Sequence, residues 1–181
     1  MRVLGISGSL RRDSYNTALL RAAAAEVACR GVELVLWRGL ADVPAYSEDL
    51  DTVPAAAAAL RRELVEADAV LIATPEYNAS VPGALKNALD WASRPFPANA
   101  LRGKPVAVIG ASQGIFGAVW AQADLRRILK AIGAVVDPRE LPVGRVHEAF
   151  TEDGRLRDPE LAARLRAIVD DLLCEQAERA A

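Results

Sequence analysis

The sequence predicts an α/β domain in which a parallel sheet of five strands is covered by helices on both faces. Short apolar runs alternate five times with stretches of helical spacing, which is the pattern of repeated strand–helix units. Three of the runs are apolar at nearly every position, as is typical of strands buried on both faces. For five strands joined by right-handed crossovers the order 2-1-3-4-5 is the commoner arrangement, and we expect it here.

The first half of the chain supplies two strand–helix units. The apolar run RVLGIS at 2–7 precedes a helix over about 14–30, which begins at residue types that commonly cap helices. The run VELVLW at 32–37 leads through a loop with proline and aspartate to a helix that begins near Pro54. Proline suits the first turn of a helix, because the backbone N–H that it lacks has no partner there.

The second half supplies the other three units. The run AVLIAT at 69–74 precedes the loop PEYNASVPG and a helix over about 84–93. The run PVAVIGAS at 105–112 precedes a glycine-containing loop and a helix over about 118–132. The last unit joins the shortest expected strand, at 134–136, to a helix over about 159–177.

Length and composition favour a single domain over residues 1–181. Hydrophobic residues make up 52% of the chain and charged residues 25%, so a sizeable core is expected and disorder is not. The net charge of -2 gives no general attraction for nucleic acid or an anionic membrane. No apolar run approaches the ~20 residues of a membrane span, and no signal-peptide pattern is present. We therefore expect a cytoplasmic protein without nucleic-acid or membrane partners.

Few residues of the kinds that bind metals or form disulfides are present. Cys29 and Cys174 are the only cysteines and both fall in expected helices, so we expect two buried thiols rather than a disulfide. His147 is the only histidine and lies outside any cluster of cysteines or carboxylates. A metal site is therefore not expected.

Two unusual loops follow the first and third strands of the predicted sheet. In the order 2-1-3-4-5 these strands are neighbours, and ligands of such sheets bind at the carboxyl ends of the strands where the order reverses. GSLRRDSYNT follows the first strand and PEYNASVPG follows the third. We therefore expect the two loops to face each other across a ligand-binding crevice.

The first loop concentrates groups that bind anions. Ser9, Ser14 and Thr17 carry hydroxyls, Asn16 carries an amide and Arg11 carries a fixed positive charge. The helix that begins near Ser14 adds backbone N–H groups without helical partners and the positive end of its dipole. The loop suits a terminal phosphate, but a capped helix with solvated arginines explains the same residues equally well.

Comparison with known phosphate-binding sequence patterns reduces the range of possible ligands. The loop lacks the Gly-Lys-Ser/Thr of nucleoside triphosphate sites, and Gly5 and Gly8 do not form the G-x-G-x-x-G of dinucleotide sites. The second strand ends in Trp37-Arg38, where a dinucleotide site would place an acidic residue. These differences favour a single phosphate monoester. Phosphorelay receiver domains share the topology but need acidic residues at the ends of strands one and three, where this chain has Ser7-Gly8 and Thr74-Pro75.

The loop after the third strand carries Pro75, Glu76, Tyr77 and Asn78 ahead of a second proline turn. Its prolines stiffen the chain and leave backbone N–H and C=O groups free for a ligand. A flat heterocycle fits such a loop, with its polar edge read by the main chain. The alternative is an ordinary edge loop with an exposed tyrosine.

The loop after the fourth strand contains Ser112, Gln113, Gly114 and Gly117. Small residues allow a ring to approach the backbone closely. A flexible strand-to-helix turn is the alternative interpretation of these residues.

Taken together, these loops resemble the flavodoxin-like NAD(P)H-dependent FMN reductase family, whose members also reduce quinones, azo dyes or chromate. The similarity rests on GSLRRDSYNTALL and TPEYNASVPGALKNALDWASR and covers about residues 2–135. The pattern PEYN-x-S-x-P-G-x-L-K-N-x-L-D-W is long enough to be specific. It implies a flavodoxin-like three-layer sandwich with bound FMN. The third loop, SQGIFGA, departs from the more glycine-rich S-x-G-G-x-G-G of many relatives.

The resemblance also assigns roles to particular residues. The FMN phosphate would be held by Ser9, Arg11, Ser14, Asn16 and Thr17. The isoalloxazine ring would lie against the second and third loops, at Pro75, Glu76, Tyr77, Asn78, Ser112, Gln113 and Gly114.

The activity implied by the resemblance is hydride transfer from NADPH, or NADH, to FMN and then to a small-molecule electron acceptor. The acceptor would be a quinone, free flavin, an azo compound or a metal oxyanion. No catalytic side chain is expected, because the flavin carries the hydride chemistry. NADPH is the expected donor, on the strength of the family and of Arg12 and Arg38 nearby.

Two other classes of function are alternatives. A non-enzymatic flavodoxin-type electron carrier shares the fold, but such carriers are usually strongly acidic. The net charge of -2 and the presence of Arg11 in the first loop favour the reductase. A flavin-free binding or regulatory domain is the other alternative, and it is excluded if the purified protein is yellow.

We also expect a homodimer or homotetramer. Aromatic residues make up 5% of the chain, and several of them fall in or near the expected cleft loops. Aromatic side chains at the mouth of a site are typical of interface cores. The aromatic residues concerned are Trp91, Phe96, Phe116 and Trp120, and the apolar Ile115 lies among them.

Overall fold

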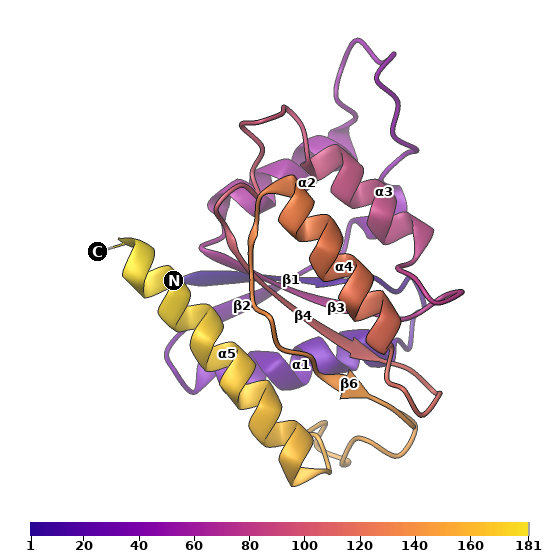
Figure 1. The fold of residues 1–181 in the computed structure, drawn as a ribbon, viewed down its shortest axis with the longest axis vertical. Helices are drawn as coiled ribbons and strands as arrows, with labels where there is room; N and C mark the ends of the chain where they lie inside the picture. Colours follow the sequence, from indigo (N-terminus) through magenta and orange to yellow (C-terminus); the bar gives the residue numbers. More distant parts are fainter. Residues whose placement is uncertain (181) are drawn as a thin grey trace.

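The structure, a computed structural model, describes residues 1–180, with side chains described for residues 1–174. Its centre is a parallel sheet in the order β2-β1-β3-β4-β5, as the sequence predicts (Figure 1). The strands are β1 (Arg2–Ser7), β2 (Glu33–Trp37), β3 (Ala69–Thr74), β4 (Pro105–Ala111), β5 (Val135–Val136) and β6 (Pro142–Val143). The helices are α1 (Tyr15–Ala28), α2 (Ala55–Glu66), α3 (Gly83–Ala92), α4 (Val119–Ile132) and α5 (Pro159–Ala180), with a short 3-10 turn η1 (Leu40–Asp42).

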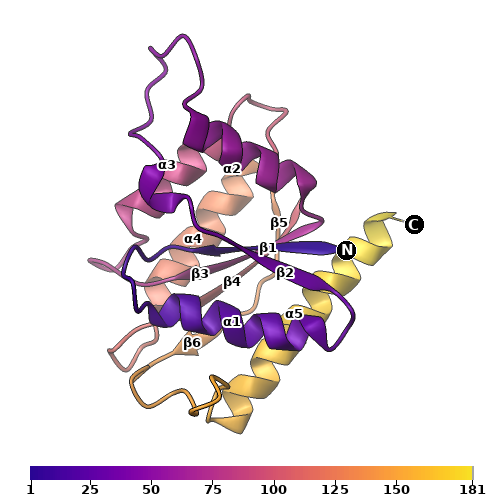
Figure 2. The same ribbon diagram turned by 180° about the vertical axis from the view of Figure 1, so that it is seen from behind.

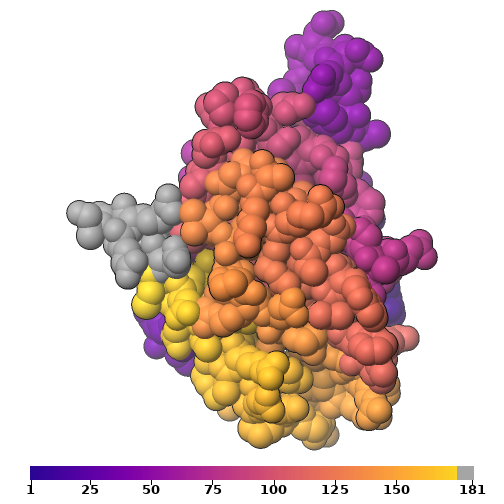
Figure 3. Space-filling model, in the orientation of Figure 1, coloured from indigo at the N-terminus to yellow at the C-terminus, as the bar shows by residue number. Residues whose placement is uncertain are grey.

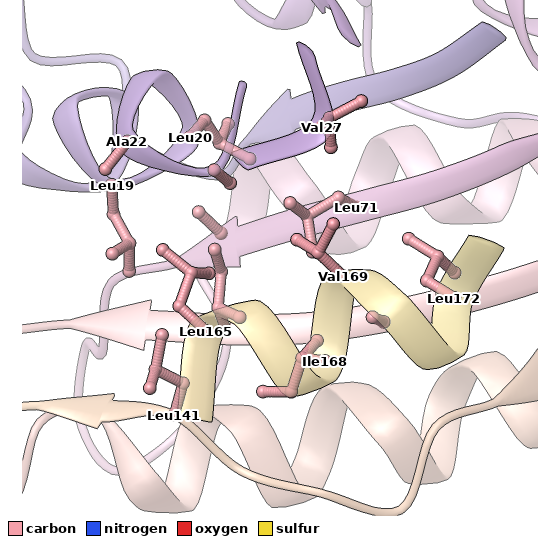
Figure 4. Close-up of a cluster of buried hydrophobic side chains, with 14 of the residues drawn as sticks. Leu19, Leu20, Ala22, Val27, Leu71, Leu141, Leu165, Ile168, Val169 and Leu172 are labelled. Atoms are coloured by element: carbon pink, nitrogen blue, oxygen red, sulfur yellow. The ribbon is translucent and has the colours of Figure 1, made fainter. Parts of the chain in front are cut away.

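Helices cover both faces of the sheet. Helices α1 and α5 lie on one face, and α2, α3 and α4 lie on the other (Figures 1 and 2). Successive strand residues point to opposite faces, so Leu71 packs under α1 and α5 whereas Ile72 packs under the other three helices. Figure 4 shows the first of these two layers, in which α5 presents Leu165, Ile168 and Leu172 to the sheet. Burial on both faces explains why the central strands are apolar at nearly every position.

The fifth strand position is divided between two short strands. The sequence predicts one strand at 134–136, but β5 pairs only with the start of β4 and β6 pairs with its end, at Gly110 and Ala111. The chain leaves the sheet between them, where Pro138 has no N–H to donate to a ladder. β6 itself has two residues and begins with proline, so no run of β-forming residues marks it in the sequence.

The expectation of two buried thiols is wrong. Both Cys29 and Cys174 are exposed. Cys29 caps the end of α1, beyond its last buried turn. Cys174 follows the buried Leu172 by two positions, and two positions on a helix turn a side chain to the opposite face.

No helix in the part of the chain that the structure describes is long and apolar enough to cross a lipid bilayer.

The loop between β4 and α4 is held tightly against β6. Gly117 has a φ of +58°, and a Cβ placed there would lie 2.3 Å from the carbonyl carbon of Pro142. Gly114, three residues earlier, has only the Ser112 hydroxyl within 4 Å of such a Cβ, at 3.8 Å. Only one of these two glycines is therefore required by backbone conformation and space.

Gly117→Ala should lower the free energy of unfolding by about 2 kcal/mol or more, because it combines an unfavourable φ with a backbone clash. Gly114→Ala is the matched control and should leave the denaturation midpoint close to that of the wild type. Urea denaturation of both variants measures the difference. Equal midpoints for the two variants would contradict this account of the loop.

Candidate functional site

Three loops meet at the carboxyl ends of β1, β3 and β4. The N–H of Gly8, just after β1, donates to the carbonyl of Ala73 at 2.8 Å and so joins the first loop to β3. The resulting cleft contains every residue assigned to the site from the sequence except Thr17, Asn78 and Gly114. It is lined by Ser9, Arg11, Ser14, Tyr15, Asn16, Pro75, Glu76, Tyr77, Ala111, Ser112, Gln113 and Val146.

The first loop forms one end of the cleft, and its groups there are suited to binding an anion. Ser14 caps α1, its Oγ accepting the N–H of Thr17 at 3.3 Å, and the Ser9 hydroxyl accepts the N–H of Arg11 at 3.3 Å. The earlier N–H groups of the first turn, at Tyr15 and Asn16, have no partner within the helix and lie beside the cleft. Arg11 is exposed and makes no ion pair with the side chains that the structure describes. The helix-cap interpretation of this loop is confirmed; the residues that cap the helix also line the cleft, and phosphate binding stays a prediction.

The side chains of two residues predicted to contact phosphate make hydrogen bonds within the fold. The Asn16 amide is buried, and it both donates to the carbonyl and accepts the N–H of Ala111, each at 3.0 Å. It therefore ties the start of α1 to the end of β4, leaving its own backbone N–H for a ligand. Thr17 Oγ1 donates to the Ser7 hydroxyl at 3.0 Å, and Thr17 lies outside the cleft.

The second loop is a stiff two-residue turn. Tyr77 and Ser80 exchange two backbone hydrogen bonds, of 3.0 and 3.1 Å, around Asn78 and Ala79. These two have φ values of 52° and 59°, as in a type I′ turn. Asn78 tolerates this conformation better than most residues, and it lies exposed at the tip of the turn, outside the cleft. Tyr77, half exposed, is the residue of the turn that lines the cleft.

Ser80 fixes this turn to α4. Its hydroxyl donates to Oδ2 of Asp124 at 2.5 Å. This hydrogen bond, with a second one from Arg127, holds the pKa of Asp124 below its ordinary value. Asp124 therefore stays ionised at neutral pH and keeps accepting the hydroxyl that anchors the turn.

Glu76 links the second loop to the third. Its Oε2 accepts the backbone N–H groups of Trp120 and Ala121, at 3.0 and 3.1 Å, in the first turn of α4. The residue that precedes α4, Ala118, has a left-handed backbone and no side chain that could cap the helix. A carboxylate is favourable at a helix N-terminus, so Glu76 supplies the missing cap from another loop. The sequence places Glu76 at the site but does not reveal this role.

The third loop is supported from behind by residues that the sequence analysis missed. Backbone bonds join Ser112 to Val143 and Val146, and join the N–H of Arg145 to the carbonyl of Gly114 at 3.0 Å. The buried side chain of Gln122 donates to the carbonyl of Gly117, also at 3.0 Å.

The sequence analysis did not identify Tyr15, Ala111 and Val146 as part of the cleft. Tyr15 and Ala111 adjoin residues that it did identify. Val146 lies in a segment without a motif, so nothing in the sequence marks it.

Of the five large apolar residues predicted to gather around the cleft loops, only three are exposed at this end of the sheet. Ile115, Phe116 and Trp120 are 63%, 56% and 48% exposed, and the last two rings meet edge to face at 4.9 Å. Trp91, in contrast, is 3% exposed and packs inside the fold, with its indole N–H donating to Pro44. Phe96 is exposed but follows α3 and precedes β4, which places it at the opposite end of the sheet.

The cleft suits a planar ring that carries a phosphate. Hydroxyls, helix N–H groups and Arg11 gather at one end, where they suit a phosphate monoester. The other end has few charged side chains and is walled by Pro75–Tyr77, the segment that leads into the rigid turn, and by Ser112 and Gln113. This division of the cleft matches a mononucleotide better than a simple anion.

Comparison with known proteins identifies the family. The model of the NADPH-dependent FMN reductase family matches residues 1–148. An NAD(P)H-dependent FMN reductase of Pseudomonas aeruginosa is 44% identical over 161 residues, which cover 87% of this chain and 85% of that protein. A quinone reductase of Escherichia coli is 40% identical over 139 residues, covering 75% of this chain and 73% of that protein.

A solved structure supports the same family assignment. The flavoenzyme NAD(P)H:(acceptor) oxidoreductase FerB from Paracoccus denitrificans superposes with a TM-score of 0.85 at 38% identity, covering 98% of this chain and 97% of that one. A flavodoxin from Pseudomonas aeruginosa, 15% identical with a TM-score of 0.61, shares the fold alone. The fold is therefore flavodoxin-like, and the chain belongs to the NADPH-dependent FMN reductase family of flavin-dependent oxidoreductases.

Proposed function

We propose that the cleft binds FMN and that the chain reduces small-molecule acceptors with NADPH or NADH. The observation that carries the proposal is that one cleft contains both a group of anion-binding residues around Arg11 and the segment Pro75–Tyr77, which leads into the rigid turn. Bound FMN would accept a hydride from the nicotinamide and pass it to the acceptor. A quinone is the acceptor best supported by the relatives, since most of them are named for quinone reduction. Free flavin, azo compounds and metal oxyanions are further candidates.

The polar residues of the first loop fall into two groups. Some would bind the ligand directly, and others keep the ligand-binding residues in position. Ser9, Ser14 and Arg11, with the N–H groups of the first turn of α1, would bind the phosphate. Thr17 positions Ser7 behind the loop, through the hydroxyl bond at 3.0 Å. Asn16 would contribute its backbone N–H, because its side chain is bonded to Ala111.

The ring end of the cleft would work mainly through the main chain. Pro75 to Asn78 and Ser112 to Gly114 would border the isoalloxazine, with Glu76 fixing the distance between the two loops by capping α4. No side chain here is placed as a proton donor for hydride transfer, and none is needed for that step.

An electron carrier of the flavodoxin type remains the alternative function. The fold does not distinguish the two, because solved flavodoxins superpose on this chain. Arg11 beside the phosphate position and a net charge of only -2 favour the reductase. An electron carrier would take no hydride from a nicotinamide nucleotide, so the kinetics below separate the two functions.

Turnover should follow a ping-pong mechanism. One open cleft, bordered by the 75–78 and 112–117 loops, leaves a single surface on which nicotinamide and quinone can stack, so the two must bind in turn. NADPH should bleach the flavin absorbance fully under anaerobic conditions, and quinone added after removal of the nucleotide should restore it. Double-reciprocal plots at several quinone concentrations should give parallel lines. Intersecting lines would mean that both substrates bind together.

Arg11→Ala should weaken FMN binding about 10- to 100-fold, since it removes a charge-assisted hydrogen bond worth ~1.5–3 kcal/mol. The thermal midpoint of the apoprotein should barely change, because Arg11 is exposed. Fluorescence titration with FMN measures the affinity. Arg62→Ala, which removes an exposed arginine of α2 outside the cleft, is the control and should bind FMN like the wild type. Equal affinity in both variants would make Arg11 merely a solvated side chain.

We also propose that the chain forms a homodimer or homotetramer. Ile115, Phe116 and Trp120 are exposed apolar residues in the loop before α4 and in its first turn, and the rings of the last two are in contact. The arm formed by residues 43–54 projects from the body in Figure 3 and exposes Leu50 and Val53. Burial of such surfaces between copies is favourable.

Phe116→Glu should shift the protein toward monomer, because it would place a charge in the proposed interface. Val65→Glu changes another exposed apolar residue, on α2, and should leave the assembly intact. Light scattering at micromolar concentration gives the mass of each. A wild-type protein that is already monomeric would contradict the proposal.

A further inference from the structure

The arm formed by residues 43–54 is held away from the body of the protein by side chains of α3. The Asn87 amide donates to the carbonyl of Pro44 at 2.9 Å and accepts the N–H of Tyr46 at 2.8 Å. The indole N–H of Trp91 donates to the same carbonyl of Pro44, also at 2.8 Å. These bonds fix the base of the arm, and the rest of it projects beyond α2 and α3 (Figures 1 and 2). The arm is therefore held in one direction rather than left to fold against its own body.

The tip of the arm, residues 49–53, combines acidic and apolar side chains and is exposed at every position. Leu50 and Val53 are 49% and 42% exposed. Asp49 and Asp51 make no ion pair with any side chain that the structure describes. A tip of this composition suits a hollow that combines positive charge with an apolar surface.

A pocket of that character lies on the other side of the first loop from the cleft, and Ser9 lines both. It is lined by Arg12 of the loop, Arg21 of α1 and Arg38 after β2, and none of its lining residues is acidic. All three arginines are exposed and make no ion pair with any side chain that the structure describes. Leu10, 57% exposed, lines the same pocket, which we call the arginine pocket. Three like charges around one hollow repel one another, so an acidic partner would relieve that repulsion.

The arm does not reach the arginine pocket of its own chain. No residue of the arm lines that pocket. The base of the arm is bonded to α3, on the opposite face of the sheet from α1, which contributes Arg21 (Figures 1 and 2). A second copy of the chain is free of this restriction. Since every copy carries both an arm and a pocket, each can insert its arm into the pocket of the other, which gives two identical contacts about a two-fold axis.

We infer that the arm of one copy binds the arginine pocket of a second copy. Asp49 and Asp51 pair with the arginines of the pocket, and Leu50 packs against its apolar wall at Leu10. The inference rests on the proposed self-association of the chain, for which it names a contact separate from the aromatic pair at Phe116. Complementary charges fix the orientation of the two copies and exclude contacts between like-charged surfaces.

Charge reversal on each side of the contact tests the inference. Arg21→Glu together with Arg38→Glu makes the pocket acidic, and Asp49→Lys together with Asp51→Lys makes the arm basic. All four residues are exposed, so both double variants should fold. Light scattering at micromolar concentration should give each double variant half the mass of the wild type. An equimolar mixture of the two should regain the wild-type mass, because every arm then meets a pocket of opposite charge.

Arg62→Glu reverses an exposed charge on α2, outside the arginine pocket, and is the control that should keep the wild-type mass. Double variants that keep the wild-type mass, or a mixture that does not regain it, would overturn the inference. A change in kcat/KM for NADPH without a change in mass would also overturn it, because the arginines would then serve the nucleotide rather than a second copy.

Phe116→Glu separates the arm contact from the proposed aromatic interface. If Phe116→Glu lowered the mass and the charge reversals did not, the proposed association would stand and the arm contact would be wrong. If the charge reversals lowered the mass and Phe116→Glu did not, the arm contact would stand and the aromatic interface would be wrong. A monomeric wild type would contradict both. None of these masses depends on flavin reduction, so they leave the proposed enzymatic function to its own tests.

Discussion

The parallel pairing of β1 with β3 is the constraint on which the site depends. This pairing aligns Ser7 with Ala73, and the Gly8 N–H extends it by one further bond. Two segments more than 60 positions apart in the chain therefore emerge side by side at one edge of the sheet. The first then enters α1, whose N-terminus faces the edge, so an anion-binding helix end and a rigid turn share one cleft. The chemistry of the site follows from this position rather than from any single reactive side chain.

Several polar residues at the cleft hold the loops in place rather than offering free groups to a ligand. The buried amide of Asn16 satisfies both backbone groups of Ala111, which would otherwise be costly to bury unpaired. Glu76 caps α4 across the cleft, and Ser80 anchors the same loop to Asp124. These bonds fix the separation of the three loops before a ligand arrives. A preformed site loses less conformational entropy on binding than a flexible one.

The sequence predicted the strand order, the positions of the helices and the three loops of the cleft, because hydrophobic periodicity and loop chemistry are local properties. It did not predict the division of the fifth strand, since β6 has two residues and starts with proline. The burial of Trp91 and the exposure of both cysteines depend on which face of a helix meets the sheet. Those outcomes depend on packing between distant segments. The residue pattern of a single helix does not determine them.

The central claim is that the first loop is a site for a single phosphate monoester, and comparison of FMN with riboflavin tests it most directly. The two ligands have the same ring and differ only in the phosphate. Fluorescence titration of the apoprotein should show FMN bound about a hundredfold or more tightly than riboflavin, as expected for the loss of several charge-assisted hydrogen bonds. Equal affinities would contradict the account, because they would show that the loop contributes nothing to the recognition of phosphate.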